Sequence, residues 1–193
     1  MTEPESDIPY WRKREGRIAS IASQIGRSDF STGDRAALRR LDPDRPNYAG
    51  LAVVLRVMRN AGIKIDELGT RRLGRWTLLI HAMALMSGPG KSPHVQGKGR
   101  SGGVLHAGFY SESRLMRLLE ARGTTRDDLI RRLARFLAAK GLAIDWVALA
   151  PLILDDEDGE DAERARLRIA RDYYAAEARD AAQTKSLEQG LAQ

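Results

Sequence analysis

Five arginines in the C-terminal half of the chain are the residues whose type and spacing most clearly suggest a chemistry. They are Arg114, Arg117, Arg131, Arg132 and Arg135. Helical spacing places each of them off, or at the margin of, the apolar stripe of its own segment. The guanidinium group offers a planar fork of donors that matches phosphate oxygens, so such a row can follow a nucleic-acid backbone without reading bases. The same pattern is also typical of a solvated helix face whose arginines pair with acids such as Asp127 and Asp128.

A glycine-rich basic segment, residues 88–103 (GPGKSPHVQGKGRSGG), precedes these arginines. Its glycines and prolines make regular structure costly, so we expect a mobile loop. Lys91, Lys98 and Arg100 in this loop could close over the same nucleic-acid backbone. The phrase GPGKS is similar to the end of a phosphate-binding loop, but that motif requires a glycine where Leu85 stands and a strand before it. Nucleotide hydrolysis is therefore not indicated.

The other reactive side chains show no catalytic or metal-binding arrangement. There is no cysteine, and His81, His94 and His106 lie far apart without a carboxylate at metal-ligand spacing. We interpret one of them as a core histidine and two as solvent-exposed. No nucleophile elbow is present either. We therefore predict no catalytic residues, no metal and no cofactor, in a protein that is not an enzyme.

Charge favours a polyanionic partner. The 193 residues include 32 Lys and Arg against 26 Asp and Glu, a formal net charge of +6. Acidic residues gather in a compact cluster at residues 155–163, which leaves the middle of the chain basic. No apolar run approaches the roughly 20 residues that span a bilayer. The first seven residues carry three acidic side chains and a proline where a secretory signal would be basic and then apolar, so we expect a cytoplasmic protein without a membrane partner.

Helical periodicity runs through nearly every readable segment, and no run alternates between apolar and polar residues as a strand would. The pattern predicts an all-α fold of two packed helical lobes. A helix over residues 71–86 turns almost wholly apolar after Trp76 and is expected to be the buried centre of the first lobe. The predicted parts are an N-terminal lobe (1–87), the Gly/Lys-rich loop (88–103), a C-terminal lobe (104–183) and a tail (184–193).

Capping signals set the expected helix ends in the second lobe. Thr124 or Thr125, followed three residues later by an aspartate, predicts the start of a helix that stops at Gly141. Asp145 can cap the next helix. The last helix is expected from about residue 161 to residue 182, beginning with acidic residues that complement its positive dipole end.

Five phrases in a fixed order resemble the CasB family, the small subunit of the type I-E CRISPR Cascade surveillance complex. They are GDRAALRRL (33–41), SESRLMRLLEARG (111–123), LIRRLARFL (129–137), IDWVALAPLIL (144–154) and RIARDYY (168–174). The family's basic positions correspond to Arg114, Arg131 and Arg132. Where some relatives carry a further basic residue this chain has Glu120, and Arg117 lies one turn earlier.

The resemblance implies a two-lobed helical protein without a catalytic role. Its implied partners are other Cascade protein subunits, the guide-RNA ribonucleoprotein, displaced single-stranded target DNA and a second copy of itself. The implied function is to bind nucleic-acid backbone and to stabilise the R-loop in antiviral defence. Because only 6% of the residues are aromatic, we expect electrostatics to dominate this binding.

Two other interpretations fit the same residues. The chain could be a helical DNA-binding regulator in which residues 126–140 form a groove-reading helix, although a compact helix-turn-helix signature is lacking. It could instead be a protein-interaction scaffold whose arginines meet acidic partners and never touch phosphate.

Overall fold

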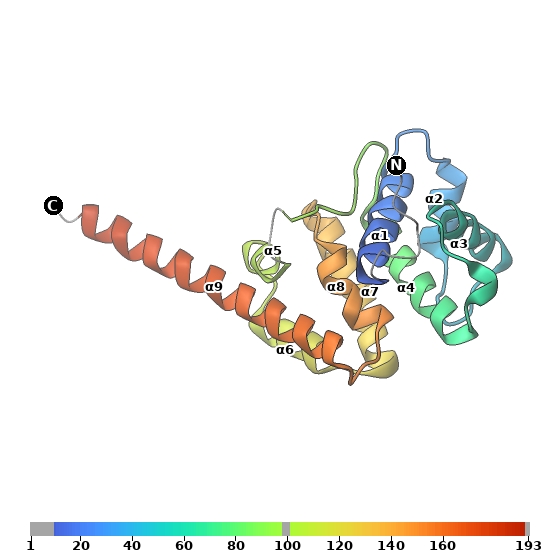
Figure 1. Cartoon of the computed structure of the whole chain (residues 1–193). Helices are drawn as coiled ribbons and strands as arrows, with labels where there is room; N and C mark the ends of the chain where they lie inside the picture. Colours follow the sequence, from blue (N-terminus) through green and yellow to red (C-terminus); the bar gives the residue numbers. More distant parts are fainter. Residues whose placement is uncertain (1–9, 98–100, 192–193) are drawn as a thin grey trace, which may run out of the picture.

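The fold consists of α-helices joined by mostly short connections, with a longer one between residues 86 and 101 (Figure 1). The computed structural model describes residues 10–97 and 101–191, and these parts contain no β-strand and no helix long and apolar enough to cross a membrane. The predicted all-α fold is therefore confirmed. The helices are α1 (Tyr10–Gly26), α2 (Thr32–Arg40), α3 (Tyr48–Asn60), the 3-10 helix η2 (Ile65–Glu67), α4 (Thr70–Met86), α5 (Ser101–Ala107), α6 (Glu112–Glu120), α7 (Gly123–Lys140), α8 (Trp146–Leu154) and α9 (Glu160–Leu191).

Helix α4 lies at the centre of the fold. Nearly all of its residues from Trp76 to Met86 are buried. A helix that is apolar all round must be covered on every side, and α4 packs against α1, α2, α3, α7 and α8. The prediction of a buried central helix in this segment is confirmed.

Both halves of the chain contribute to one hydrophobic core. Ile21 of α1, Leu79 of α4, Leu133 of α7 and Trp146 of α8 belong to the same cluster of buried side chains. The predicted division into two lobes is not confirmed, because α4 of the first half packs directly against α7 and α8 of the second.

Two of the predicted helix ends are confirmed, and one is wrong. Helix α7 ends at Gly141, which has φ +68°, and the side chain of Asp145 accepts hydrogen bonds from the first backbone amides of α8. Helix α7 begins at Gly123, however, before the predicted threonine caps. Its first amide donates to Glu157 in the α8–α9 connection (2.8 Å), so a residue distant in sequence caps this helix.

The glycine-rich segment is more ordered than its composition suggests. Backbone hydrogen bonds join Gly88 to Lys91 and Val95 to Ile144, so this part is tied to the start of α8. Residues 101–103, predicted to be loop, form the first turn of α5. Lys98 and Arg100 lie outside the described residues.

Gly102 explains why glycines occur in that turn. A Cβ atom at this position would lie 2.1 Å from the carbonyl oxygen of Ile169 and 2.4 Å from the backbone nitrogen of Tyr173. Helix α5 thus packs directly against the backbone of α9, which only a residue without a side chain allows. Glycine in a sequence usually indicates a loop. At this position it instead allows two helices to pack closely.

Helix α9 is longer than expected. It continues through residues 184–191, the predicted tail, and its C-terminal part extends away from the body of the protein (Figure 1). Residues 177–189 are all exposed. This part of α9 has no buried face and therefore no apolar stripe in its sequence. The sequence consequently predicts an end of the helix that is too early.

Replacing Gly102 with alanine tests the close packing of α5 and α9. Gly102→Ala should lower the free energy of unfolding by about 1–3 kcal/mol, because the methyl group has no space between the two backbones. Gly103→Ala is the matched control, since its Cβ would meet nothing closer than 3.9 Å. Higher helix propensity should leave that variant unchanged or more stable by up to about 1 kcal/mol. Urea denaturation measures both, and equal stabilities would contradict the packing argument.

Candidate nucleic-acid interface

Helices α6 and α7 present the predicted arginines because each helix buries one face. Helix α6 buries Leu115, Leu118 and Leu119 against the core, so Arg114 and Arg117 lie on its exposed side. Helix α7 packs its apolar stripe onto α4 and leaves Arg132 and Arg135 exposed. The helical spacing that placed these four arginines outside the apolar stripes is therefore correct.

Three of the arginines surround one cavity of about 290 Å³. Arg114 and Arg117 reach it from α6, and Arg132 reaches it from α7. Within residues 10–97 and 101–191, none of the three forms an ion pair or a side-chain hydrogen bond. Their charges are consequently available to an external anion. The other lining residues are Tyr110, Leu129 and Phe136, and we call this site the basic–aromatic cavity.

The neighbouring arginines influence the pKa of the Tyr110 hydroxyl group. Burial raises the pKa of Tyr110, and the positive charges of Arg114 and Arg117 act against that rise. Both guanidinium groups are therefore close enough to Tyr110 to influence its hydroxyl group.

A second cavity, of about 490 Å³, lies between α7 and the α2 segment, and its lining combines arginines with Asp42, Asp44 and Asp128. Arg132 lines both cavities, and Arg135 lines the second together with Arg39 and Arg40. Sequence reasoning recognised the arginine-rich α2 segment but did not assign Arg39 and Arg40 to the site, because helical periodicity cannot show that α2 and α7 face one cavity. Both arginines are exposed, and Arg39 also donates to the carbonyl groups of Ala84 and Ser87.

Arg131 differs from the other predicted arginines because carboxylates already surround it. Its guanidinium group lies 2.7 Å from Asp128, 3.0 Å from Asp44 and 3.8 Å from Asp42, and only 13% of its side chain is exposed. Burial lowers the pKa of Arg131, but hydrogen bonds to Asp44 and Asp128 outweigh burial and raise it overall. Arg131 thus joins α7 to the α2–α3 connection.

The glycine-rich segment does not reach the arginine cavities where it is described. Lys91 is exposed, lines neither cavity and follows a tight turn that contacts the end of α1 at Gly26. Since Lys98 and Arg100 fall outside the described residues, the predicted closure of this segment over a bound backbone stays a prediction.

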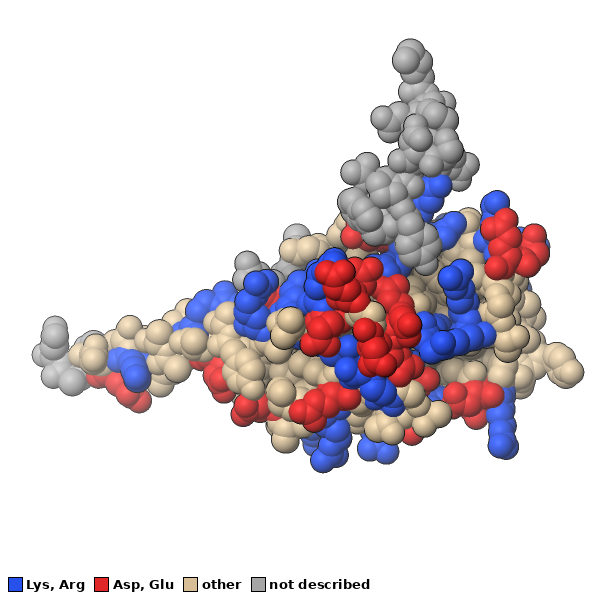
Figure 2. Space-filling view, turned by 60° about the horizontal axis from the view of Figure 1, so that its bottom comes forward, with Lys and Arg blue, Asp and Glu red and all other residues tan. Residues whose placement is uncertain are grey.

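The acidic segment 155–163 also neutralises arginines within the protein. Asp155 pairs with Arg14 at 2.6 Å, and Glu157 lies 3.1 Å from the buried Arg126. The hydrogen bond from the Gly123 amide lowers the pKa of Glu157, and nearby arginines add to this effect although burial opposes it. Figure 2 shows acidic side chains gathered near the middle of one face, with basic side chains around them.

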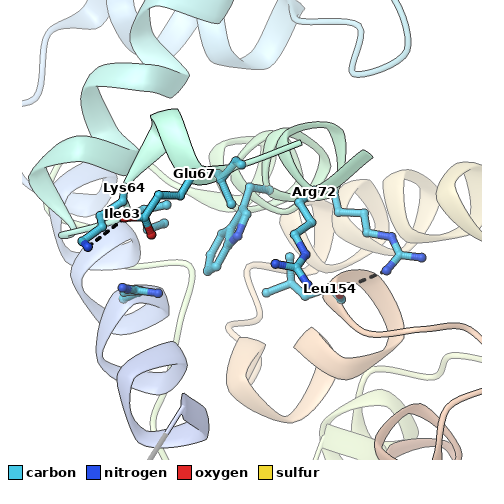
Figure 3. A pocket seen from close by; sticks show the side chains of 9 residues that line it. Ile63, Lys64, Glu67, Arg72 and Leu154 are labelled. Carbon is cyan, nitrogen blue, oxygen red and sulfur yellow. Dashed lines mark hydrogen bonds and ion pairs between the residues drawn. The ribbon is translucent and has the colours of Figure 1, made fainter. Parts of the chain in front are cut away.

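A third cavity lies apart from these arginines (Figure 3). Ile63, Lys64 and Glu67 lie on one side of it, and Arg72 and Leu154 lie on the other. An ion pair of 2.8 Å joins Lys64 to Glu67. At about 160 Å³ it is the smallest of the three cavities described here. None of the five arginines predicted to bind nucleic acid lines it.

The three histidines are dispersed, and two of them are buried. His81 lies below the second cavity, where its Nδ1 donates to the Leu38 carbonyl at 2.9 Å. Burial lowers the pKa of His81, Arg131 and Arg135 lower it further, and the Leu38 carbonyl and Asp42 oppose them. The described residues contain no group of His, Cys, Asp or Glu that could hold a metal ion.

His94 corrects the interpretation of two solvent-exposed histidines. Its side chain is only 6% exposed, and its Nδ1 accepts a hydrogen bond from the Trp146 amide. Burial lowers the pKa of His94, although Asp145 and the backbone hydrogen bond to Ile144 oppose this effect. His106 contacts Asp180 at 2.9 Å nearer the surface.

Removing Arg131 should damage the fold, whereas removing its neighbour should not. Arg131→Gln leaves three aspartates without their shared cation and should lower the free energy of unfolding by about 1–2 kcal/mol. Arg132→Gln is the control and should change it by no more than about 0.5 kcal/mol, since Arg132 is exposed and unpaired. Chemical denaturation of both variants measures this difference, and equal losses would show that the carboxylate cluster contributes no stability.

Stability should fall as the pH drops below about 6.5, the ordinary pKa of histidine. The folded protein keeps His81 and His94 neutral, so the unfolded chain binds more protons in that range and protonation favours unfolding. Replacing both histidines with asparagine should reduce the change of stability with pH in the range between the ordinary pKa of histidine and the lowered pKa values of His81 and His94. Urea denaturation at pH 7.5 and 5.5 measures this, and an unchanged slope in the variant would exclude the two histidines as its cause.

A family model matches most of the chain. The model described as CRISPR-associated protein Cse2 matches residues 34–174, which run from α2 into α9 and include the arginines of both cavities. No curated protein and no solved structure matches the chain. Since Cse2 and CasB denote one family, the match confirms the resemblance found in the five phrases. The chain therefore belongs to the Cse2 family, the small subunit of the type I-E CRISPR Cascade complex.

Proposed function

We propose that this Cascade subunit binds the sugar-phosphate backbone of nucleic acid and holds the displaced DNA strand, which stabilises the R-loop. The observation that carries the proposal is the basic–aromatic cavity, where three arginines without carboxylate partners among the described residues converge from two helices. Its role in the complex is structural, with other Cascade subunits, the guide-RNA ribonucleoprotein and a second copy of the chain as partners.

The contrast among arginines supports this assignment. Arg126 and Arg131 are largely buried and lie beside carboxylates, so their charges already stabilise the fold. Arg114, Arg117, Arg132 and Arg135 are exposed and have no such partner among the described residues. Several unpaired guanidinium groups on one surface repel each other, and an external polyanion relieves that repulsion. Phosphate oxygens match their donor geometry.

The position of α7 argues against a groove-reading regulator. A recognition helix needs its N-terminal residues free to enter the major groove. The first amide of α7 instead donates to Glu157, whose carboxylate would repel DNA phosphates at this helix end, and Arg126 is buried. Residues of α6 flank its exposed face as well. Contact with a backbone across both helices fits this arrangement better than insertion of one helix.

A triple exchange tests the proposed function. Arg114→Gln, Arg117→Gln and Arg132→Gln together should weaken binding of single-stranded DNA and shorten R-loop lifetime in the assembled complex. Each lost phosphate contact reduces the slope of log affinity against log salt by about 0.7, so the triple variant should lose about 2. Fluorescence anisotropy at several salt concentrations measures the slope.

The matched control removes the same number of charges elsewhere. Arg59, Arg71 and Arg179 are exposed and line none of the described cavities, so their triple exchange should leave most of the binding intact. Equal losses of DNA binding in the two variants would show that the effect depends only on net charge. Normal DNA binding combined with defective assembly in the first variant would favour a protein-interaction scaffold.

A further inference from the structure

Phe109 occupies a backbone conformation that costs energy without improving the packing of the fold. It ends the turn after α5 with φ +61°, the only non-glycine residue with positive φ in the described parts of the chain. The amides of Phe109 and Tyr110 donate back to His106 and Leu105, the pattern of a helix end whose left-handed position is usually glycine. A bulky residue is strained there.

The strain is not compensated by burial, because 85% of Phe109 is exposed. Among the described residues, Lys140 of α7 contacts the ring, with its Nζ 5.8 Å from the ring centroid. A strained, exposed aromatic ring beside a cation is a feature of a binding surface, since a folding role would bury the ring.

Phe109 directly precedes a residue of the basic–aromatic cavity in the chain. Its neighbour Tyr110 lines the cavity and packs edge-on against Phe136, with ring centroids 5.1 Å apart. Along α7, Arg132, Phe136 and Lys140 follow at intervals of four residues and therefore share one face. Cations and aromatic rings thus alternate along that face and across the turn that holds Phe109.

This alternation suits a ligand that is itself alternately anionic and aromatic. Unpaired guanidinium groups attract phosphates, and the rings of Phe109 and Phe136 offer surfaces on which unstacked bases can stack. An acidic peptide would satisfy the cations but would leave both rings without a partner. Duplex DNA would fit poorly as well, because its bases are stacked inside the helix.

We propose that this surface binds unstacked nucleobases of a single strand, one in the cavity against Phe136 and another on the exposed ring of Phe109. The inference rests on the proposed function and deepens it, since the subunit then holds the strand through its bases as well as its phosphates. Stacking tolerates any base, so no sequence preference follows.

An abasic oligonucleotide separates the two kinds of contact. The full-length chain should bind single-stranded DNA about tenfold or more tightly than a sugar-phosphate strand of the same length that lacks all bases. Equal affinity for the two strands would overturn the base-binding inference while leaving backbone binding intact. Failure to bind either strand would reject the proposed function together with it.

Substitution of Phe109 gives a variant whose loss of binding cannot result from misfolding. Phe109→Gly removes the strain at positive φ and should not lower the melting temperature. It should nevertheless weaken binding of ordinary single-stranded DNA by about tenfold and leave binding of the abasic strand unchanged. Phe109→Tyr, which keeps the ring, should bind as the unaltered chain does.

A second control addresses exposed apolar residues in general. Leu187 is 69% exposed on the extending part of α9, far along the helix from α5, so Leu187→Ala should bind both strands normally. If the Phe109→Gly variant binds both strands as tightly as the unaltered chain does, the proposal is overturned. If that variant then failed to enter the complex, the ring would be assigned to a protein contact.

Discussion

Burial of α4 on every side is the constraint on which the rest of the structure depends. Its C-terminal half offers no solvent face, so neighbouring helices must surround it, and each of these can bury only one side. The polar groups of α4 are accommodated by hydrogen bonds to nearby backbone, Thr77 to Leu73 and His81 to Leu38. Because α7 packs its apolar stripe on α4, its arginines lie on the outward face. The central helix thus determines where the basic surface can form.

Pairing with carboxylates then determines which arginines remain available to an external anion. A guanidinium group near the core requires anionic or carbonyl partners, since an unpaired buried charge is very unfavourable. Arg14, Arg126 and Arg131 obtain such partners from the acidic segment after α8, from aspartates of α7 and from the α2–α3 connection. The surface between α6 and α7 receives none from the described residues. The external charge of the protein therefore depends on which arginines are left unpaired, which the net charge alone does not reveal.

Sequence reasoning succeeded where a signal is local. Helical period, the glycine stop at Gly141 and the aspartate cap at Asp145 all act within a few residues, and each is present in the structure. It failed where the partner is distant in sequence. Glu157 caps α7, Asp42 and Asp44 of the α2–α3 connection pair with Arg131, and Gly102 allows two helix backbones to touch. No periodicity encodes these contacts, because they depend on how the helices are arranged around α4.

The same distinction changes the interpretation of the aromatic residues. An aromatic content of 6% favours binding by charge alone when the residues are treated as a composition. The fold instead places Tyr110 and Phe136 beside the unpaired arginines and Phe109 beside Lys140, so the proposed base contacts need only a few rings in one place. Phe109 stands out because its conformation is unfavourable and its ring is unburied. A residue that weakens the isolated fold at such a place is more readily explained by a contact that the isolated chain does not contain.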